Sequence, residues 1–229
     1  MEAFPPLVRE DGSGLFVEVL KHIETVADLS FSFGVMTLAR AKVQVDTGQD
    51  QILMVTAGPD EAPEFHKQFV WLDWSVPVVV DIYYKTDTAL EKLERAKAGE
   101  ETDILIGVLI GNTKLAAEIL ELDPTFDFVE VTTERQLVRL VDLGRIDLTI
   151  WARHPIFLMA RSLGVSGIKY QKVAEIIGTM SFKNSPDGIR LRDTIDASIR
   201  QIDITDIFHD YETLLHLPDS GTVPSSSAN

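Results

Sequence analysis

DILIGVLIGNTKLAAE, residues 103–118, is an apolar run that stops at Gly111, Asn112 and Thr113 and continues into a helical pattern. This order predicts a strand, a tight turn and the first turn of a helix. Amides in a first helical turn have no partner within the helix, so Asn112, Thr113 and the amides after them could receive an anionic or polar group. These residues alone leave a plain strand-to-helix connection as the alternative.

The composition of the chain restricts the classes of function. A chain of 229 residues with 45% hydrophobic content can form one large domain or two modest lobes with cores of their own. The formal net charge is −15 and no basic run is present. Because binding to a phosphate backbone requires a surplus of Lys and Arg, we expect no nucleic-acid partner.

The chain contains no cysteine. This excludes a disulfide framework, a thiolate nucleophile and Cys-based zinc or iron–sulfur sites, and it leaves the redox compartment open. No stretch reaches the roughly 18 apolar residues of a membrane helix, and no signal peptide precedes Glu2. The pattern is typical of a soluble protein, either complete or already trimmed.

The spacing of apolar residues predicts helices and strands in alternation. Phe16, Val19, Leu20 and Ile23, for example, lie on one helical face. Thr133 and Gln136 have the spacing of a capping box, which marks the start of a helix. Helices are predicted over residues 15–26, 38–47, 86–98, 154–162, 186–200 and 206–216, after Gly111, and from residue 133 to Gly144. Strands are predicted over residues 30–35, 51–55, 69–74, 76–84, 103–110, 126–131, 146–151, 168–177 and 179–182.

An internal repetition indicates the architecture. Residues 45–48 and 141–144 each end a helix at a glycine and lead into a strand. Strands that alternate with helices favour parallel sheets, so we expect two α/β lobes of similar build. Ligands bind outside the carboxyl ends of such strands. The strand ends at residues 56–58, 111–113 and 152–154 would meet in one cleft if the lobes face each other; otherwise they are separate units without a shared site.

Several motifs along the chain occur in a recognisable order. They are the Pro5–Pro6 pair, the sequence ARA at residues 39–41, IGVLIGNTKL at 106–115, ERQLVRLVDLGRIDL at 134–148 and FKNSPDGIRLRDTIDASI at 182–199. Each motif is weak, but their order from Phe4 to His216 resembles the type 2 periplasmic solute-binding proteins. Within that class the chain is most similar to the amino-acid-binding-like branch, bacterial extracellular solute-binding family 3.

The resemblance implies an α/β, two-lobed periplasmic-binding-protein-like fold of type II with a central cleft and a hinge of two strands. Residues 1–85 plus 179–216 would form the outer lobe and residues 86–178 the inserted lobe. Residues 217–229 lack the apolar content to pack, so we expect a flexible tail. The 76–84 run is long enough to cross between the lobes.

The resemblance also implies a function. The protein would bind a small polar solute outside the cytoplasm, in the periplasm, close around it by hinge motion and deliver it to the permease of an ABC transporter. We expect a monomer without enzymatic activity, cofactor, metal or catalytic residues.

Nine residues are candidates for ligand contact. Phe4 matches an aromatic residue before the Pro pair, Arg40 matches an Arg at the start of a helix, and Asn112 and Thr113 match a small polar pair. The full set is Phe4, Arg40, Thr56, Ala57, Trp74, Asn112, Thr113, Arg153 and His154.

Two departures from the family concern the ligand. Amino-acid binders carry an Arg for the α-carboxylate where this chain has residues 59–62, PDEA, and an Asp for the α-amino group where it has Ala152. We therefore expect a ligand other than a standard α-amino acid, although Arg40 and Arg153 could hold a carboxylate from other directions. A third departure is that only residues 1–3 precede Phe4, where the family has its first strand.

Structural roles are open for several of these residues. Arg40 could be a surface cation, Arg153 and His154 could serve only to start the next helix, and Trp71 or Trp74 could belong to the core. His209 and His216 share a helical face, which fits a solvated surface better than a metal site because no third ligand is visible. A ligand-sensing input domain or a small dehydratase-like enzyme is the alternative function, although no nucleophile elbow, HExxH, phosphate loop or dinucleotide turn is present.

Overall fold

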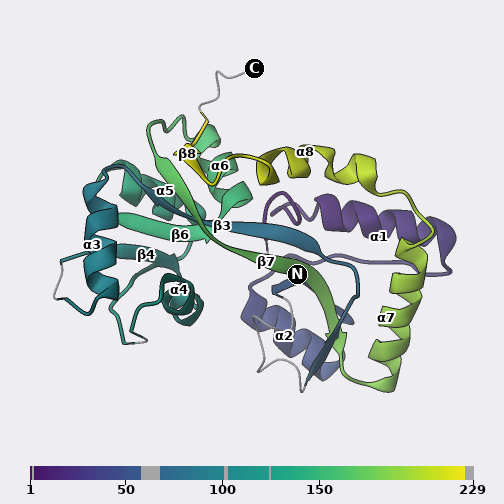
Figure 1. The fold of residues 1–229 in the computed structure, drawn as a ribbon. Coiled ribbons are helices and arrows are strands. Elements are labelled where there is room, and N and C mark those ends of the chain that lie inside the picture. Colours follow the sequence, from purple (N-terminus) through teal and green to yellow (C-terminus); the bar gives the residue numbers. More distant parts are fainter. Residues whose placement is uncertain (2, 58–67, 101–102, 124, 225–229) are drawn as a thin grey trace. The chain divides into compact units, whose positions relative to one another are not determined.

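The computed structural model describes residues 1, 3–57, 68–100, 103–123 and 125–224 (Figure 1). The chain divides into two compact units. Unit 1 comprises Met1–Val78 and Ile176–Leu215, and unit 2 comprises Val79–Glu175 and His216–Asn229. The boundaries expected from the sequence, after residues 85, 178 and 216, lie slightly further along the chain.

Unit 1 is built on antiparallel strand pairs. β1 (Ile52–Ala57) and β2 (Phe69–Trp71) both pair with the C-terminal part of β7 (Lys169–Lys183), in the register Ile52↔Phe182 and Phe69↔Lys183. The expectation of parallel pairing is therefore wrong for these strands, because β7 returns to unit 1 in the direction opposite to β1. The helices of unit 1 are α1 (Leu15–Val26), α2 (Leu38–Thr47), α7 (Pro186–Ile199) and α8 (Thr205–Leu215).

Helix α1 shows how the local sequence determines where a helix of unit 1 begins and which face it buries. Its apolar face, which includes Phe16 and Leu20, is buried in the core of unit 1. Gly14 precedes the helix with φ +134°, and a Cβ atom there would lie 2.5 Å from the carbonyl oxygen of Leu7. The first helical amides, those of Leu15 and Phe16, donate to the carbonyls of Pro6 and Leu7. A glycine is thus required where the N-terminal loop closes onto the helix.

The strand predicted at residues 30–35 does not form. Residues 28–37 have no regular secondary structure, although Phe31 and Phe33 are half-buried while Ser30 and Ser32 are exposed. The alternation of period two is therefore present without the pairing of a strand. Propensity acts locally, whereas a strand also requires a hydrogen-bonded neighbour.

Unit 2 contains the parallel part of the sheet. β4 pairs in parallel with β5 (Gly107↔Val129) and with β6 (Ile106↔Leu148), and β6 pairs antiparallel with β3. Among the described residues, no helix is both long and apolar enough to cross a membrane. The elements of unit 2 are α3 (Thr88–Lys97), β4 (Ile106–Leu109), α4 (Thr113–Leu120), β5 (Val129–Val131), α5 (Glu134–Asp142), β6 (Leu148–Ala152), α6 (Arg153–Ser162) and β8 (Ser220–Thr222).

Two strands continue from one unit into the other. β3 (Val76–Tyr84) passes the boundary at Val78, and β7 passes it at Glu175. The prediction of one long strand over residues 76–84 is confirmed. The sequence suggested a break at Gly178, but β7 runs through this position, where a Cβ atom would lie 3.1 Å from Cγ2 of Val78.

The C-terminal segment differs from the expectation of a flexible tail. β8 pairs antiparallel with the first part of β7, in the register Lys169↔Thr222, and the amide of Val223 donates to the carbonyl of Ile168 at 2.8 Å. Val223 is buried. Backbone pairing explains the difference, because it does not depend on the apolar content of the segment.

Candidate ligand-binding site

Three helices of unit 2 begin at the same edge of its sheet. β4, β5 and β6 run parallel, and α4, α5 and α6 follow their carboxyl ends directly. We call this place the carboxyl edge and define it by residues 110–113, 132–133 and 152–154. Parallel α/β sheets bind ligands outside this end of their strands, where the helix amides and dipoles favour anionic or polar groups.

At the start of α4 the polar side chains do not cap the helix. Asn112 is the N-cap residue and makes no capping bond with its side chain. Its Nδ2 donates to the carbonyl of Leu109 at 3.4 Å, a long contact. Thr113 is half-buried, and Gly111 forms the turn with φ +86°. This helix start is therefore suited to receive an acceptor group from a ligand.

The start of α5 is capped by its own side chains. Oγ1 of Thr133 accepts from the amide of Gln136 at 3.3 Å. Oε1 of Gln136 in turn accepts from the amide and the hydroxyl of Thr132, both at 2.9 Å. The predicted capping box is thus confirmed for Thr133, with the return contact one residue earlier than expected.

The start of α6 is closed by a buried ion pair. Arg153, 1% exposed, donates from Nε to Oδ2 of Asp81 at 2.7 Å and from Nη2 to Oδ1 at 2.8 Å. Nη1 donates to the carbonyl of Leu217 at 3.3 Å, and the guanidinium lies 5.1 Å from the ring centroid of Tyr170. Asp81 therefore occupies the Nε and Nη2 donors of the guanidinium. These are the donors with which Arg153 could hold a ligand carboxylate bidentately, as the sequence suggested.

Two groups of this cluster have shifted pKa values, Arg153 and Tyr83. Burial opposes the charge of Arg153, but the hydrogen bonding to Asp81 and the electrostatic attraction of Asp81 and the nearby tyrosines together outweigh it and raise the pKa of Arg153. Burial, followed by the nearby Asp81 carboxylate, raises the pKa of Tyr83 well above its usual value. The hydroxyl of Tyr83 donates to Oδ2 of Asp81 at 3.2 Å. The raised pKa values favour a charged guanidinium and a neutral phenol, and the hydrogen bonds to Asp81 give these side chains a structural role.

Sequence reasoning missed Asp81 and the partners of Arg153 on β7 and in the C-terminal segment. A signal for Asp81 was present, since it is the single acid in the apolar run VPVVVDIYY of β3. A buried acid in a strand requires a partner. His154 lies beside Arg153 and is also buried, with 3% exposure.

In unit 1, Thr56 and Ala57 lie at the carboxyl end of β1. Thr56 is buried, and its hydroxyl donates to the carbonyl of Thr179 at 3.3 Å. Ala57 pairs with Gly178. The hydroxyl of Thr179 donates to the carbonyl of Trp74 at 2.7 Å. These contacts join the end of β1 to β7 and to the segment after β2.

The aromatic candidates Phe4 and Trp74 pack against the core of unit 1. The ring of Trp74 lies 5.1 Å from that of Phe16 and 5.6 Å from that of Phe208. Phe4 is half-buried and forms an antiparallel bridge with Val8. Both residues thus have a packing role, which for Trp74 is one of the two roles that the sequence leaves open.

Arg40 lies on α2 with an exposed side chain. Its neighbour Ala41 is buried with Leu53 and Phe69 in a small cluster, so Arg40 lies beside the face that packs on the strands. Residues 59–62, the position at which the resemblance implies an Arg in amino-acid binders, lie outside the described residues.

His209 is the histidine of α8 and lies beside one acidic residue. His209 is exposed, with Nδ1 at 3.3 Å from Oδ1 of Asp210. Among the residues that the structure describes, no group of three or more His, Cys, Asp or Glu side chains could hold a metal ion.

No family model and no curated protein matches the sequence. The structure is similar to the GLUR0 ligand-binding core in complex with L-glutamate, with a TM-score of 0.70, 14% identity and coverage of 94% of this chain and 95% of that one. It is also similar to a structure that concerns glutathione import via GshT and the cystine ABC importer TcyBC of Streptococcus mutans, with a TM-score of 0.70, 13% identity and coverage of 93% and 92%.

A third similar structure is a histidine kinase sensor domain described as similar to periplasmic binding proteins, with a TM-score of 0.68, 16% identity and coverage of 93% and 90%. At these identities the likeness concerns the fold. Together with the mixed α/β architecture, it shows that this chain has a two-lobed, periplasmic-binding-protein-like fold.

Proposed function

We propose that this protein binds a small polar solute, with the start of α4 as a principal contact. The observation that supports this most directly is the difference among the three helices at the carboxyl edge. The start of α5 is capped by Thr133 and Gln136, and the start of α6 is closed by Arg153 and Asp81. Asn112 and Thr113 at α4 carry polar groups without a side-chain cap.

The proposed contacts come from both units. Asn112 and Thr113 would bind an acceptor group of the solute, and Arg40 and Thr56 would contact it from unit 1. A solute that touches both units stabilises the conformation in which it does so, and this links binding to a hinge motion. Phe4, Ala57 and Trp74 remain predicted contacts. Arg153 and His154, which are buried, would stabilise the carboxyl edge without contacting the solute.

The solute we propose is not a standard α-amino acid. Ala152, the residue before α6, is buried and has no side-chain group that could accept from an ammonium. The adjacent cation, Arg153, is paired with Asp81. A solute with hydrogen-bond acceptors and without a free α-ammonium fits these residues best.

Delivery to the permease of an ABC transporter, outside the cytoplasm, is the biological role we propose. It is supported by the likeness to the structure named for glutathione import through an ABC importer. The likeness to a histidine kinase sensor domain supports a second candidate role, the sensing of a solute for a signalling protein. Both roles require the same binding step.

A thermal-shift screen tests the proposal. Small carboxylates, sugars, polyamines and amino acids are added separately to the purified chain, and the melting temperature is measured. A solute that binds only the folded protein raises the melting temperature with its concentration. We expect a rise with carboxylates or neutral polar solutes. The absence of a rise with every class would contradict solute binding.

A further inference from the structure

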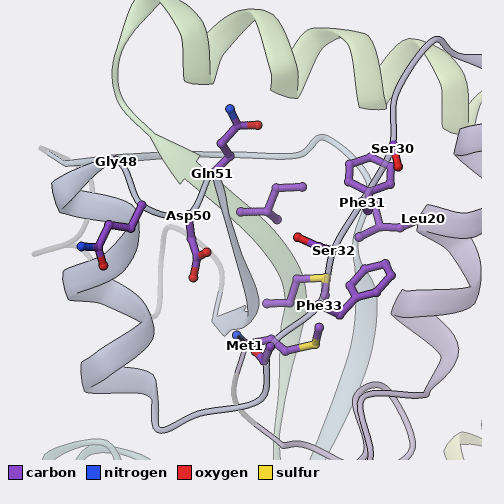
Figure 2. A pocket seen from close by; sticks show the side chains of 13 residues that line it. Met1, Leu20, Ser30, Phe31, Ser32, Phe33, Gly48, Asp50 and Gln51 are labelled. Atoms are coloured by element: carbon purple, nitrogen blue, oxygen red, sulfur yellow. Dashed lines mark hydrogen bonds between the residues drawn. The ribbon is translucent and has the colours of Figure 1, made fainter.

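Two segments of the protein differ in their backbone pairing. Residues 30–34 line a cavity of about 250 Å³ in unit 1 and pair with no strand in the described part of the chain (Figure 2). In unit 2, β8 pairs with the first part of β7 in the register Tyr170↔Gly221 (Figure 1). We call residues 217–223, which contain β8, the strap. Their contacts join this short strand to the carboxyl edge.

The strap is attached to β7 on both sides of β8. The amide of Lys172 donates to the carbonyl of Asp219 at 2.6 Å. The amide of Val223 donates to the carbonyl of Ile168 at 2.8 Å, and Val223 is buried. The three residues of β8 itself are exposed. Backbone bonds and the apolar side chain of Val223 therefore attach the strap to unit 2.

Gly221 places the strap directly against the ring of Tyr170. A Cβ atom at Gly221 would lie 3.0 Å from the hydroxyl oxygen of Tyr170 and 3.1 Å from its ring carbons Cε1 and Cζ. These distances are shorter than ordinary van der Waals contacts. Tyr170 is buried, and its ring lies 5.1 Å from that of Phe157, so it has little room to move aside. A branched side chain at position 221 would therefore push the strap away from the ring.

The strap also contacts Arg153, the first residue of α6. Nη1 of Arg153 donates to the carbonyl of Leu217 at 3.3 Å, and the guanidinium lies 5.1 Å from the centroid of the Tyr170 ring. The strap thus reaches Arg153 directly through Leu217 and indirectly through Tyr170. Because β6 and β4 are paired, the starts of α6 and α4 lie at the same carboxyl edge. The strap is therefore linked to that edge through one buried side chain.

Of these two attachments of Arg153, the strap is the weaker and Asp81 the stronger. Asp81 accepts from Nε and Nη2 at 2.7 and 2.8 Å in a buried ion pair. The bond to Leu217 is longer and has a neutral acceptor. Short edge strands with exposed residues open at a lower free energy than the core does. The strap can therefore detach while the pair between Arg153 and Asp81 remains.

We propose that docking of the strap is coupled to solute binding at the carboxyl edge. This inference rests on the proposed function and adds a means of regulation to the same site. The docked strap supports Arg153 and with it the first turn of α6, at the same edge as Asn112 and Thr113. When the strap detaches, this turn becomes more mobile and the edge binds the solute less tightly. Coupling is reciprocal, so bound solute also stabilises the docked strap.

Three variants of the full chain test the coupling. Gly221→Val places a branched side chain against the ring of Tyr170 and should detach the strap. Val223→Ser removes the buried apolar side chain and detaches the strap without a change at that ring. Thr222→Val, at an exposed position between the other two, is the matched control because it adds the same side chain where there is room for it.

Amide hydrogen exchange and affinity are measured for each variant. The amides of Lys172 and residue 223 report on the strap, since both donate across its pairing with β7. The amides of Ile156 and Phe157 report on the first turn of α6, and those of α5 show whether unit 2 stays folded. Calorimetric titration gives the affinity for the solute with the largest thermal shift.

Without solute, we expect Gly221→Val and Val223→Ser to exchange about tenfold faster than the wild type at the strap and at the first turn of α6, while α5 stays protected. Both variants should bind the solute about fivefold more weakly. Saturating solute should slow exchange at the strap of the wild type, although the strap is not a proposed solute contact. Thr222→Val should behave as the wild type does.

Three results would overturn the proposal. The first is a detached strap with unchanged exchange at Ile156 and Phe157, a result that requires no solute. The second is wild-type affinity in both variants whose strap is detached, and the third is a strap whose exchange does not respond to bound solute. The last two contradict the coupling alone. A wild type that binds no solute would contradict the proposed function and the coupling together.

Discussion

The starts of α4 and α6 differ, although both follow neighbouring parallel strands of unit 2. At α6, Arg153 is buried, donates hydrogen bonds to Asp81 and Leu217, and lies over the ring of Tyr170. At α4, Asn112 makes one long side-chain contact and no cap. One start is occupied by groups of the protein itself, and the other is suited to a ligand.

This difference shows that position at a carboxyl edge does not by itself make a residue a ligand contact. Arg153 and Asn112 were predicted for the same reason, because both follow a strand end. What separates them is a second partner from a distant part of the chain. Asp81 lies 72 positions before Arg153 and occupies its guanidinium.

The largest expected effect is on stability, through the buried ion pair at the start of α6. Replacing Asp81→Ala leaves the Arg153 charge buried without its carboxylate, and we expect a loss of about 3–5 kcal/mol in the free energy of unfolding. Urea unfolding measures it. The double change Asp81→Leu with Arg153→Met removes both charges and should recover most of the loss. A double variant as unstable as the single one would show that the charge pair is not the cause.

A matched control is the exposed ion pair Lys169–Asp87, at 2.8 Å in the same unit. Because solvent screens it, Asp87→Asn should change the unfolding free energy far less than Asp81→Ala. Equal losses would contradict the assigned role of burial.

The second prediction concerns the exposed arginine of unit 1. Arg40→Ala should weaken binding of the solute by about 1.5–3 kcal/mol if Arg40 makes a charge-assisted hydrogen bond to it. Calorimetric titration measures this change. Arg161→Ala, an exposed arginine near the end of α6, serves as the control and should bind as the wild type does. An unchanged affinity for Arg40→Ala would remove this residue from the site.

The third prediction compares two helix starts at the carboxyl edge. Thr133→Ala removes a cap that accepts from Gln136 and should cost about 1 kcal/mol of stability. Asn112→Ala should cost only a few tenths of a kcal/mol, since its side chain does not cap α4. Urea midpoints of the two variants provide the measurement. A cost for Asn112→Ala as large as that for Thr133→Ala would indicate a structural role for Asn112.

The smallest effect concerns Asp196, a buried acid in unit 1. Its carboxylate accepts from the amide of Asp73 at 3.1 and 3.2 Å, and burial raises its pKa above the ordinary 3.8. At a pH between the ordinary pKa and the raised pKa, Asp196 keeps its proton in the folded protein and releases it in the unfolded chain. The contribution of Asp196 to stability therefore falls as pH rises through this window.

Urea unfolding of the wild type and of Asp196→Asn, from about pH 3.5 to 7, tests this sign. The stability of the wild type relative to the variant should fall with rising pH and then stay constant. A relative stability that rises with pH would contradict the raised pKa.

Much of the fold could be predicted from the sequence, because apolar spacing is a local property. The helices at residues 15–26 and 38–47 and the strand at 76–84 have the predicted bounds. Pairing is not local. The antiparallel direction of β1 and β7 and the strand β8 depend on segments far apart in the sequence. Residues 30–35 have strand periodicity but pair with no strand in the described part of the chain.

Less of the candidate site could be predicted. The sequence identified the strand-to-helix turns, since glycine and small polar residues mark them, and unit 2 places Asn112 and Thr113 at the same edge as Arg153 and His154. It could not show that Asp81 and Leu217 take up the guanidinium. Whether an arginine contacts a ligand or serves as a structural cation depends on its burial and on its long-range partners. The local sequence predicts neither its burial nor its partners.

The most direct test of solute binding at the start of α4 is a calorimetric titration. The solute that gives the largest thermal shift is titrated into the wild type and into a variant that combines Asn112→Ala with Thr113→Val. Loss of hydrogen bonds to the solute should weaken binding about tenfold or more, while the fold and the melting temperature without solute change little. An affinity equal to that of the wild type would contradict the account.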